Sequence, residues 1–256
     1  MQQNKCTTIE FFSFETSVPL ALDAINADQV LKDQETILVK PNLVNSSPHP
    51  ITTSPDFCRA MVKYIVSCSK ADVIIAEGCG DADLDTHEIF HRLGYEAVAK
   101  EFGADLVDLN HEPLCVVKNN SNSLFKEMYL PEIAFRSYIV SLPVLKAHSL
   151  ADVTGTLKNM MGFAPPKHYS HGRGSWKKGR FHNNMQQSII ELNRFITPDL
   201  TLMDASIGMA EYHLGGPTLS PPAKKLIAGY DPVCVDQRAA ELLGLDPQSI
   251  EHLCVR

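Results

Sequence analysis

The sequence predicts a single α/β domain over residues 1–256, built on a mainly parallel twisted sheet with helices on both faces. Apolar runs rich in β-forming residues alternate with segments of helical periodicity along most of the chain. This alternation is typical of parallel strands that are covered on both sides. The composition, with 44% hydrophobic and 21% charged residues, is that of a globular chain able to bury a sizeable core.

The expected strands are short apolar runs that end at a proline, a glycine or a polar residue. They cover residues 35–44, 72–78, 104–109, 138–146, 200–206 and the start of 224–245. The first run breaks at Pro41-Asn42, where a strand cannot continue its ladder of donors.

The expected helices carry apolar residues three or four positions apart. They cover residues 56–69, 85–103, 184–196 and the end of 224–245. Ser54-Pro55 supplies a capping hydroxyl and a first-turn proline for the helix that follows. The pattern over 85–103 ends at a glycine, the usual residue just past a helix end.

Polar side chains stand at the ends of four of these strands. They are Lys40 with Asn42, Glu77, Lys146 with His148, and Asp204. Ligands of open α/β sheets bind in the crevice outside the carboxyl ends of the strands. The sequence therefore predicts a site at this edge of the sheet.

A cationic segment follows the expected strand at 138–146. No Asp or Glu occurs from Val153 through Ile190, although the net charge of the whole chain is −7. Thr154-Gly155-Thr156 can present backbone N–H groups at a helix start, directly before Lys158-Asn159. Together these groups predict a cradle for phosphate or carboxylate, with residues 164–183 as a Gly-rich basic loop inserted in the domain as a small lobe or flap. The alternative is a solvated basic loop without a ligand.

Residues 87–91 read HEIFH, the helix motif of zinc proteases. The third ligand of the extended motif would fall at Ala97, and no downstream glutamate lies in the required context. We therefore interpret His87 and His91 as surface residues of an amphipathic helix, and the sequence assigns no metal site.

The seven cysteines are scattered and none forms a C-x-x-C pair, so no iron–sulfur cluster is expected in this chain. We interpret them as reduced cytosolic thiols. The negative net charge argues against nucleic-acid binding, despite Trp176 within HGRGSWKKGR. No leader pattern and no long apolar run is present, so a cytoplasmic protein without a membrane partner is expected.

Nine sequence features occur in an order that resembles a known family. They are KPNLV (40–44), TTSP (52–55), EG (77–78), LGY (93–95), SLPVLKAH (141–148), TGTLKNMMG (154–162), His171, MDAS (203–206) and IAGYDPVCVD (227–236). The series is similar to the bacterial and archaeal domain-of-unknown-function family number three hundred and sixty-two. Many members carry a ferredoxin-like module for two 4Fe–4S clusters, and this chain lacks the clustered cysteines of that module. The family's recurrent polar positions map onto Lys40, Asn42, Thr53, Glu77, Lys146, His148, Lys158, Asn159, His171, Asp204, Asp231 and Asp236.

Two functions from different classes are compatible with these residues. In the first, the protein binds or transforms a small phosphorylated or carboxylated molecule, and the catalytic residues are Lys146, His148, Lys158 and His171. The substrate-binding residues are then Lys40, Asn42, Thr53, Gly155 and Asn159, and the acids that orient them or hold a metal are Glu77, Asp204 and Asp236. In the second, the chain is a non-catalytic partner that docks a separate ferredoxin-like protein on its basic residues 167–182. The sequence leaves the choice between them open and identifies no cofactor.

Overall fold

The central sheet runs from β1 at one edge to β4 at the other. The computed structural model of the protein describes residues 6–170 and 177–254. The strand order is β1 (Cys6–Glu10), β11 (Lys225–Gly229), β10 (Leu200–Met209), β7 (Tyr138–Leu142), β2 (Thr36–Pro41), β3 (Asp72–Glu77) and β4 (Asp105–Asp108). β7 pairs in parallel with β10 and β2, and β3 pairs in parallel with β2 and β4. The predicted mainly parallel sheet is confirmed, and β11 adds an antiparallel edge with β10 and β1.

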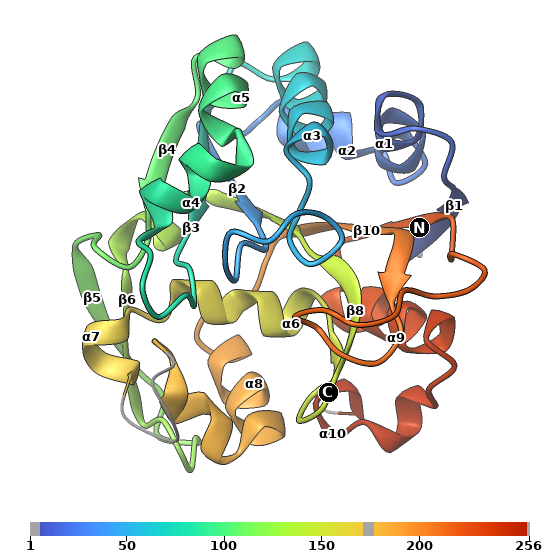
Figure 1. Cartoon of the computed structure of the whole chain (residues 1–256). Coiled ribbons are helices and arrows are strands. Elements are labelled where there is room, and N and C mark those ends of the chain that lie inside the picture. The colour runs from blue at the N-terminus through green and yellow to red at the C-terminus, as the bar shows by residue number, and fades with distance from the viewer. Residues whose placement is uncertain (1–5, 171–176, 255–256) are drawn as a thin grey trace.

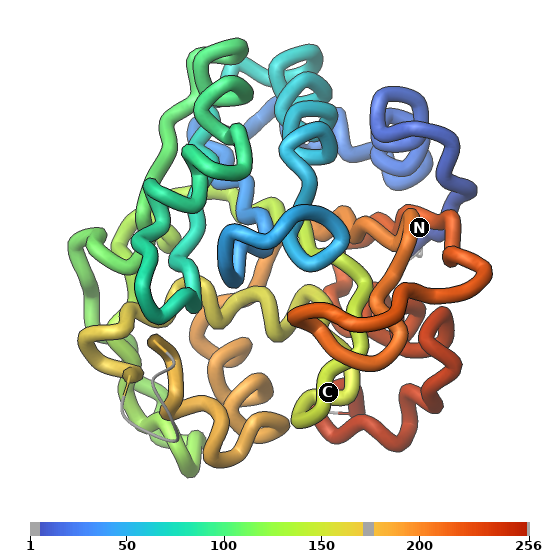
Figure 2. Tube along the Cα trace, in the orientation of Figure 1, coloured from blue at the N-terminus to red at the C-terminus, as the bar shows by residue number. Residues whose placement is uncertain are grey.

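Helices cover both faces of this sheet, as predicted (Figure 1). One face carries α1 (Phe14–Asp23), α2 (Ala27–Leu31), α3 (Pro55–Cys68), α4 (Thr86–Leu93) and α5 (Tyr95–Phe102). The other face carries α6 (Thr156–Asn159), α8 (Met185–Asn193), α9 (Pro232–Leu242) and α10 (Glu251–Cys254). Figure 2 shows the blue to green helical turns on one side of the trace and the orange to red ones on the other.

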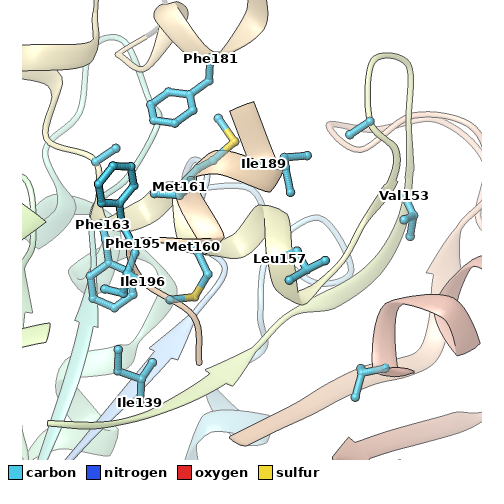
Figure 3. Close-up of a cluster of buried hydrophobic side chains, with 14 of the residues drawn as sticks. Ile139, Val153, Leu157, Met160, Met161, Phe163, Phe181, Ile189, Phe195 and Ile196 are labelled. Atoms are coloured by element: carbon cyan, nitrogen blue, oxygen red, sulfur yellow. The ribbon is translucent and has the colours of Figure 1, made fainter. Parts of the chain in front are cut away.

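The two cores on either side of the sheet follow the pleat of its strands. In β2, Ile37 and Val39 pack into the core under α1–α5, and Leu38 packs into the core under α6, α8 and α9. Successive strand side chains point to opposite faces, so an apolar run such as this one fills both cores. Figure 3 shows Leu157 and Met160 in the second core, where the α6 segment is buried.

The predicted helix over 85–103 is wrong as one element. It is divided into α4 and α5 by Gly94, whose φ of 84° lies in the left-handed region. A left-handed residue ends the hydrogen-bond pattern of one helix and lets the next begin at an angle. The start of α3 agrees with the prediction: Ser54 accepts the N–H of Asp56, and Pro55 is the first helical residue.

The predicted strand over 138–146 consists of two strands. Pro143, which has no N–H to donate, separates β7 from β8 (Val144–His148). β8 pairs in parallel with β10 and antiparallel with β9 (Asp152–Thr154). His148 is therefore the last residue of a strand and not the first residue of a loop.

The predicted Gly-rich basic loop over 164–183 is more ordered than expected where the structure describes it. Pro166–Tyr169 form α7 and Gly179–Asn183 form the 3-10 helix η3. Tyr169 and Phe181 are buried in the second core, and Figure 3 shows Phe181 there. Their apolar rings, which the charge of the segment obscured, fix the segment to the domain.

Several short elements were not predicted. The hairpin of β5 (Leu114–Lys118) and β6 (Glu127–Pro131) forms a separate two-stranded sheet. The 3-10 helices η1, η2 and η4 cover Glu132–Phe135, Met160–Phe163 and Pro247–Ser249. None of the described helices combines the length and apolar sequence needed to cross a bilayer.

The interpretation of all seven cysteines as reduced thiols is wrong for two of them. Cys6 in β1 and Cys234 in α9 form a disulfide that spans 228 positions of the sequence. The sequence could not indicate this pair, because β1 was not predicted and its place beside β11 brings Cys6 over α9. The remaining cysteines, Cys58, Cys68, Cys79, Cys115 and Cys254, are free.

Candidate functional site

A cavity of about 240 Å³ lies where β2, β3 and β8 end. Five predicted site residues line it: Asn42, Glu77, His148, Lys158 and Asn159. Lys178, His182 and His213 line it as well. Its apolar side consists of Leu43, Val44, Leu150, Met161 and Tyr212. The cavity lies at the strand ends, as expected, and its lining brings together residues more than 160 positions apart in the sequence.

A buried ion pair forms the floor of this site. Lys40 Nζ lies 2.8 Å from Glu77 Oε1, and both side chains are almost fully buried. The second carboxylate oxygen of Glu77 accepts the N–H of Leu43 at 3.1 Å. Burial lowers the pKa of Lys40, and the neighbouring carboxylate opposes that shift. Lys40 itself does not line the cavity, so its charge is matched within the protein.

Two asparagines connect this floor to the wall of the cavity. Asn159 Oδ1 accepts from Lys40 Nζ at 3.3 Å and from Asn42 Nδ2 at 3.2 Å. Asn42 Oδ1 in turn accepts from Lys146 Nζ at 2.5 Å. Because each amide uses both its donor and its acceptor, the three strand ends are held in one network.

Lys146 and Lys178 are buried beside the cavity without a carboxylate in hydrogen-bond reach among the described residues. Lys146 Nζ also donates to the carbonyl of Ile51 at 2.7 Å. Lys178 Nζ donates to the carbonyls of Gly78, Met161 and Gly162 at 2.7, 3.0 and 2.9 Å. Burial lowers the pKa of each amine to about 7, although Glu77 acts in the opposite direction on both. The solvated-loop interpretation is therefore wrong for Lys178.

Lys158 differs from these amines, because its Nζ donates to no residue that the structure describes. The side chain lines the cavity and is partly exposed within it. Burial lowers the pKa of Lys158 to about 8, so both charge states are accessible near neutral pH. Its donors are free for a ligand.

His148 presents a defined tautomer. Its Nδ1 accepts the N–H groups of Leu150 and Ala151 at 3.0 and 3.2 Å. The proton of the neutral ring is therefore on Nε2, which is buried and has no partner in the described part of the chain. Burial and the nearby charge of Lys158 hold the pKa of His148 far below its ordinary value. His148 is thus a neutral residue of the cavity wall, and its one donor is buried without a partner among the described residues.

Two further histidines complete the wall. His213, in the loop after β10, stacks on His148 with ring centroids 4.0 Å apart. Burial, together with Lys158 and Lys146, lowers the pKa of His213 to about 3. Burial and Lys158 also lower the pKa of His182 in η3. Three imidazoles in their neutral form therefore surround Lys158.

The predicted backbone cradle at Thr154-Gly155-Thr156 is not open to a ligand. The carboxylate of Asp236 in α9 accepts the N–H groups of Thr156 and Leu157 at 2.6 and 2.9 Å. Gly155 faces the same carboxylate, and a Cβ at this position would overlap it. Burial raises the pKa of Asp236 to about 6, and the two N–H groups oppose this shift. Asp236 and Gly155 thus fix the start of α6, away from the cavity lining.

Thr53 and Asp204, two other predicted residues, lie outside the cavity lining. Thr53 donates to the carbonyl of Leu142 at 2.7 Å and accepts the N–H of Asn42 at 2.8 Å, which ties β2 to β7. Asp204 Oδ2 lies 2.8 Å from His49 Nε2, and its Oδ1 accepts the N–H of Ser206. His171 lies outside the described residues, and its predicted role stays a prediction.

The surface cations of the basic segment are fewer than expected. Lys177 bends inward to the carbonyl of Leu84, and Lys178 is buried. Among the described cations of residues 167–182, Lys167 and Arg180 are the exposed ones, and Arg180 lies over the ring of Phe125. Docking of a ferredoxin-like protein here stays a prediction with a smaller charged surface to support it.

The histidines of the HEIFH motif do not line the cavity. His87 and His91 are both exposed on α4, and His91 Nδ1 lies 2.9 Å from Glu96 Oε2. No group of three or more His, Cys, Asp or Glu side chains arranged to hold a metal occurs among the described residues.

Sequence reasoning missed His213 and Tyr212 altogether. Both follow the MDAS strand by several residues, in a loop with Gly215 and Gly216. The only signal was the pair of glycines in YHLGG, which indicates a loop of unusual backbone freedom and not a position beside His148.

Comparison with known proteins identifies the family of the chain and one solved structure of similar fold. The family described as "Domain of unknown function (DUF362)" matches residues 37–241, and the chain belongs to this family. Among curated proteins, none matches the chain. A solved structure titled as the lactate racemase apoprotein from Thermoanaerobacterium thermosaccharolyticum is similar in fold, with a TM-score of 0.57 and 16% sequence identity. The similarity covers 91% of this chain and 55% of that one, so this chain spans about half the length of the solved protein.

Proposed function

We propose that the protein binds a small carboxylated or phosphorylated metabolite in the cavity and transforms it with Lys158 and His148. The observation that carries the proposal is the free Nζ of Lys158, which faces the cavity and has no acceptor among the described residues. The charge of Lys40 is matched by Glu77, whereas Lys146, Lys158 and Lys178 have no such carboxylate partner in the described structure. An anion in the cavity would supply the missing negative charge.

The size and the lining limit the ligand. A volume of about 240 Å³ is below the range of about 300–1,000 Å³ that is typical of drug-sized ligands. A dinucleotide is too large for it, whereas a metabolite of a few carbon atoms fits. The apolar side formed by Leu43, Val44 and Leu150 favours a ligand with a short hydrocarbon part beside its anionic group.

The protein with the similar fold adds support for the carboxylate class. Its title names lactate, a small 2-hydroxy carboxylate, as the molecule on which it acts. A substrate of this class would place its carboxylate near the cationic wall and an oxygen within reach of His148 Nε2. The neutral imidazole then stabilises negative charge on that oxygen by donating a hydrogen bond.

Proton uptake tests this site directly. An anion beside Lys158 raises the pKa of the amine from about 8, so binding at pH 8 draws a proton from the buffer. Calorimetry with lactate and with inorganic phosphate, in two buffers of different ionisation enthalpy, measures that proton. Lys158→Met is expected to abolish both the binding and the uptake, and Lys167→Met, at an exposed position of the same segment, to change neither. Equal binding by wild type and Lys158→Met would contradict the proposal.

A further inference from the structure

Lys158 and Lys178 line the cavity, and Lys40 and Lys146 donate to asparagines that line it. The hydrogen bonds of these four lysines separate Lys158 from the other three. Lys40 donates to Glu77 and Asn159, Lys146 donates to Asn42, and the three donors of Lys178 are all taken by carbonyl oxygens. These amines cannot approach a ligand atom without giving up buried hydrogen bonds, which is costly. Lys158 has no bond of this kind to any described residue and already faces the cavity.

The start of α6 holds the backbone of Lys158 in place. Asp236 accepts the N–H groups of Thr156 and Leu157, and Asn193 Nδ2 donates to the carbonyl of Leu157 at 2.9 Å. The residue before Lys158 is therefore fixed at both its N–H and its carbonyl. A nucleophile needs such support from its surroundings to attack in a productive geometry.

We propose that Lys158 is a covalent nucleophile that forms a Schiff base with the carbonyl group of a small 2-oxo acid or aldehyde acid. The inference rests on the proposed function, since it uses the same cavity and narrows its substrate to carbonyl compounds. In the reaction, the amine nitrogen attacks the carbonyl carbon, a C–N bond forms, and both amine protons leave with the carbonyl oxygen as water. The product is an imine, which takes one proton from solvent when it is protonated. No oxidant or reductant is involved.

His148 is placed to assist this step. Its Nε2–H is a donor without a partner in the described chain, and its Nδ1 is held by two backbone N–H groups. A hydrogen bond from Nε2 to the carbonyl oxygen makes the carbon more electrophilic and stabilises the oxygen as negative charge develops. Burial lowers the pKa of both side chains, so the imidazole of His148 is neutral and the amine of Lys158 is neutral in part of the molecules. At pH 7 an amine of pKa about 8 holds roughly 300-fold more of the neutral form than an unperturbed lysine.

Reductive trapping tests the inference. Wild type, Lys158→Met and Lys167→Met are incubated at pH 7 with glyoxylate or pyruvate and sodium borohydride, and the adducts are located by peptide mass mapping. Glyoxylate is included because it has only two carbon atoms, so a lack of labelling cannot result from a ligand too large for the cavity. We expect one adduct at Lys158 in wild type and in Lys167→Met, formed on the order of 100-fold more than at exposed lysines. Lactate, which has no carbonyl group that can form an imine, is expected to compete and suppress the labelling.

The outcomes separate this inference from the proposed function. If lactate binding requires Lys158 but borohydride traps no adduct, the proposed anion site is supported and the Schiff base is overturned. Adducts spread over exposed lysines, or confined to Lys146 or Lys178, also overturn it. Absence of both binding and adduct removes the site and the inference together. Mapping the adduct on wild type alone shows which lysine is labelled, so the test of the Schiff base does not depend on the folding of a variant.

Discussion

The burial of Lys178 makes the stability of the protein depend on pH. Comparison of wild type with Lys178→Met measures this contribution separately. Lys178 Nζ is enclosed by three carbonyl oxygens, and burial lowers its pKa to about 7 from the ordinary value of 10.5. Between these two values the unfolded chain holds a proton on Lys178 that the folded protein has released. Because the unfolded state binds more protons, the free energy of unfolding rises with pH in this window.

The magnitude follows from the two pKa values. Each unit of pH contributes about 1.4 kcal/mol for one full proton, and the folded amine is already half deprotonated at pH 7. The contribution of Lys178 between pH 7 and pH 9 is therefore about 2 kcal/mol. Replacement by methionine, which is apolar and of similar length, removes this contribution. It also leaves three carbonyls without their donor, a cost of about 1–3 kcal/mol for each that stays unsatisfied.

Urea denaturation of wild type and Lys178→Met at pH 7, 8 and 9, followed by circular dichroism, measures the effect. We expect the difference in unfolding free energy to grow by about 2 kcal/mol over this range, with the variant less stable at pH 9. The exposed Lys167→Met serves as the matched control and should show no change with pH relative to wild type. A difference for Lys178→Met that is constant or shrinks as pH rises would refute the reasoning, because the amine would then be charged throughout.

Three other features give predictions of a simpler kind. Burial raises the pKa of Glu191, but its hydrogen bonds outweigh this and lower the pKa to about 2. Wild type should therefore lose stability as pH falls from 4.5 towards 2, and Glu191→Gln should lose less stability in the same acid titration. In urea at pH 7, Glu191→Gln should be roughly 2 kcal/mol less stable than wild type. A Cβ at Gly162 would overlap the buried ion pair of Lys40 and Glu77, so Gly162→Ala should lower the melting temperature. A Cβ at Gly80 would lie at ordinary contact distances from Val44, so Gly80→Ala should not lower it. Alkylation of the denatured, unreduced protein should leave Cys6 and Cys234 unmodified, and labelling of both would contradict the disulfide.

The part of the fold that could be predicted is the part whose causes are local. The middle residues of β2 and β3 are apolar because both faces of the central sheet are buried. Ser54-Pro55 begins α3 through contacts within one turn. The division of the 85–103 helix was harder, because Gly94 is equally compatible with a helix end and with a tolerated interior residue. β1 escaped prediction because CTTIE has little apolar character and depends on β11, more than 200 positions away.

The candidate site shows the same division between local and long-range causes. The rule that ligands bind where strands end places Asn42, Glu77 and His148 correctly around one cavity. The rule that a helix start binds anions failed for Thr156, since Asp236 satisfies those N–H groups from 80 positions along the chain. No local pattern can indicate that a carboxylate of the protein already occupies such a position.

The three hydrogen-bonded lysines and the free one are parts of a single arrangement. A cavity wall with buried cations and too few carboxylates costs stability, which a fold selected for stability alone would lose by substitution to apolar residues. The protein limits this cost by satisfying Lys40, Lys146 and Lys178 with carbonyl, amide and carboxylate oxygens. Burial makes Lys158, the one amine with no partner among the described residues, easier to deprotonate. The buried cations without a carboxylate partner beside it attract an anion. A lysine that binds an oxo acid and attacks it needs both the easier deprotonation and the attraction of the anion. A site that only binds the anion needs the attraction alone.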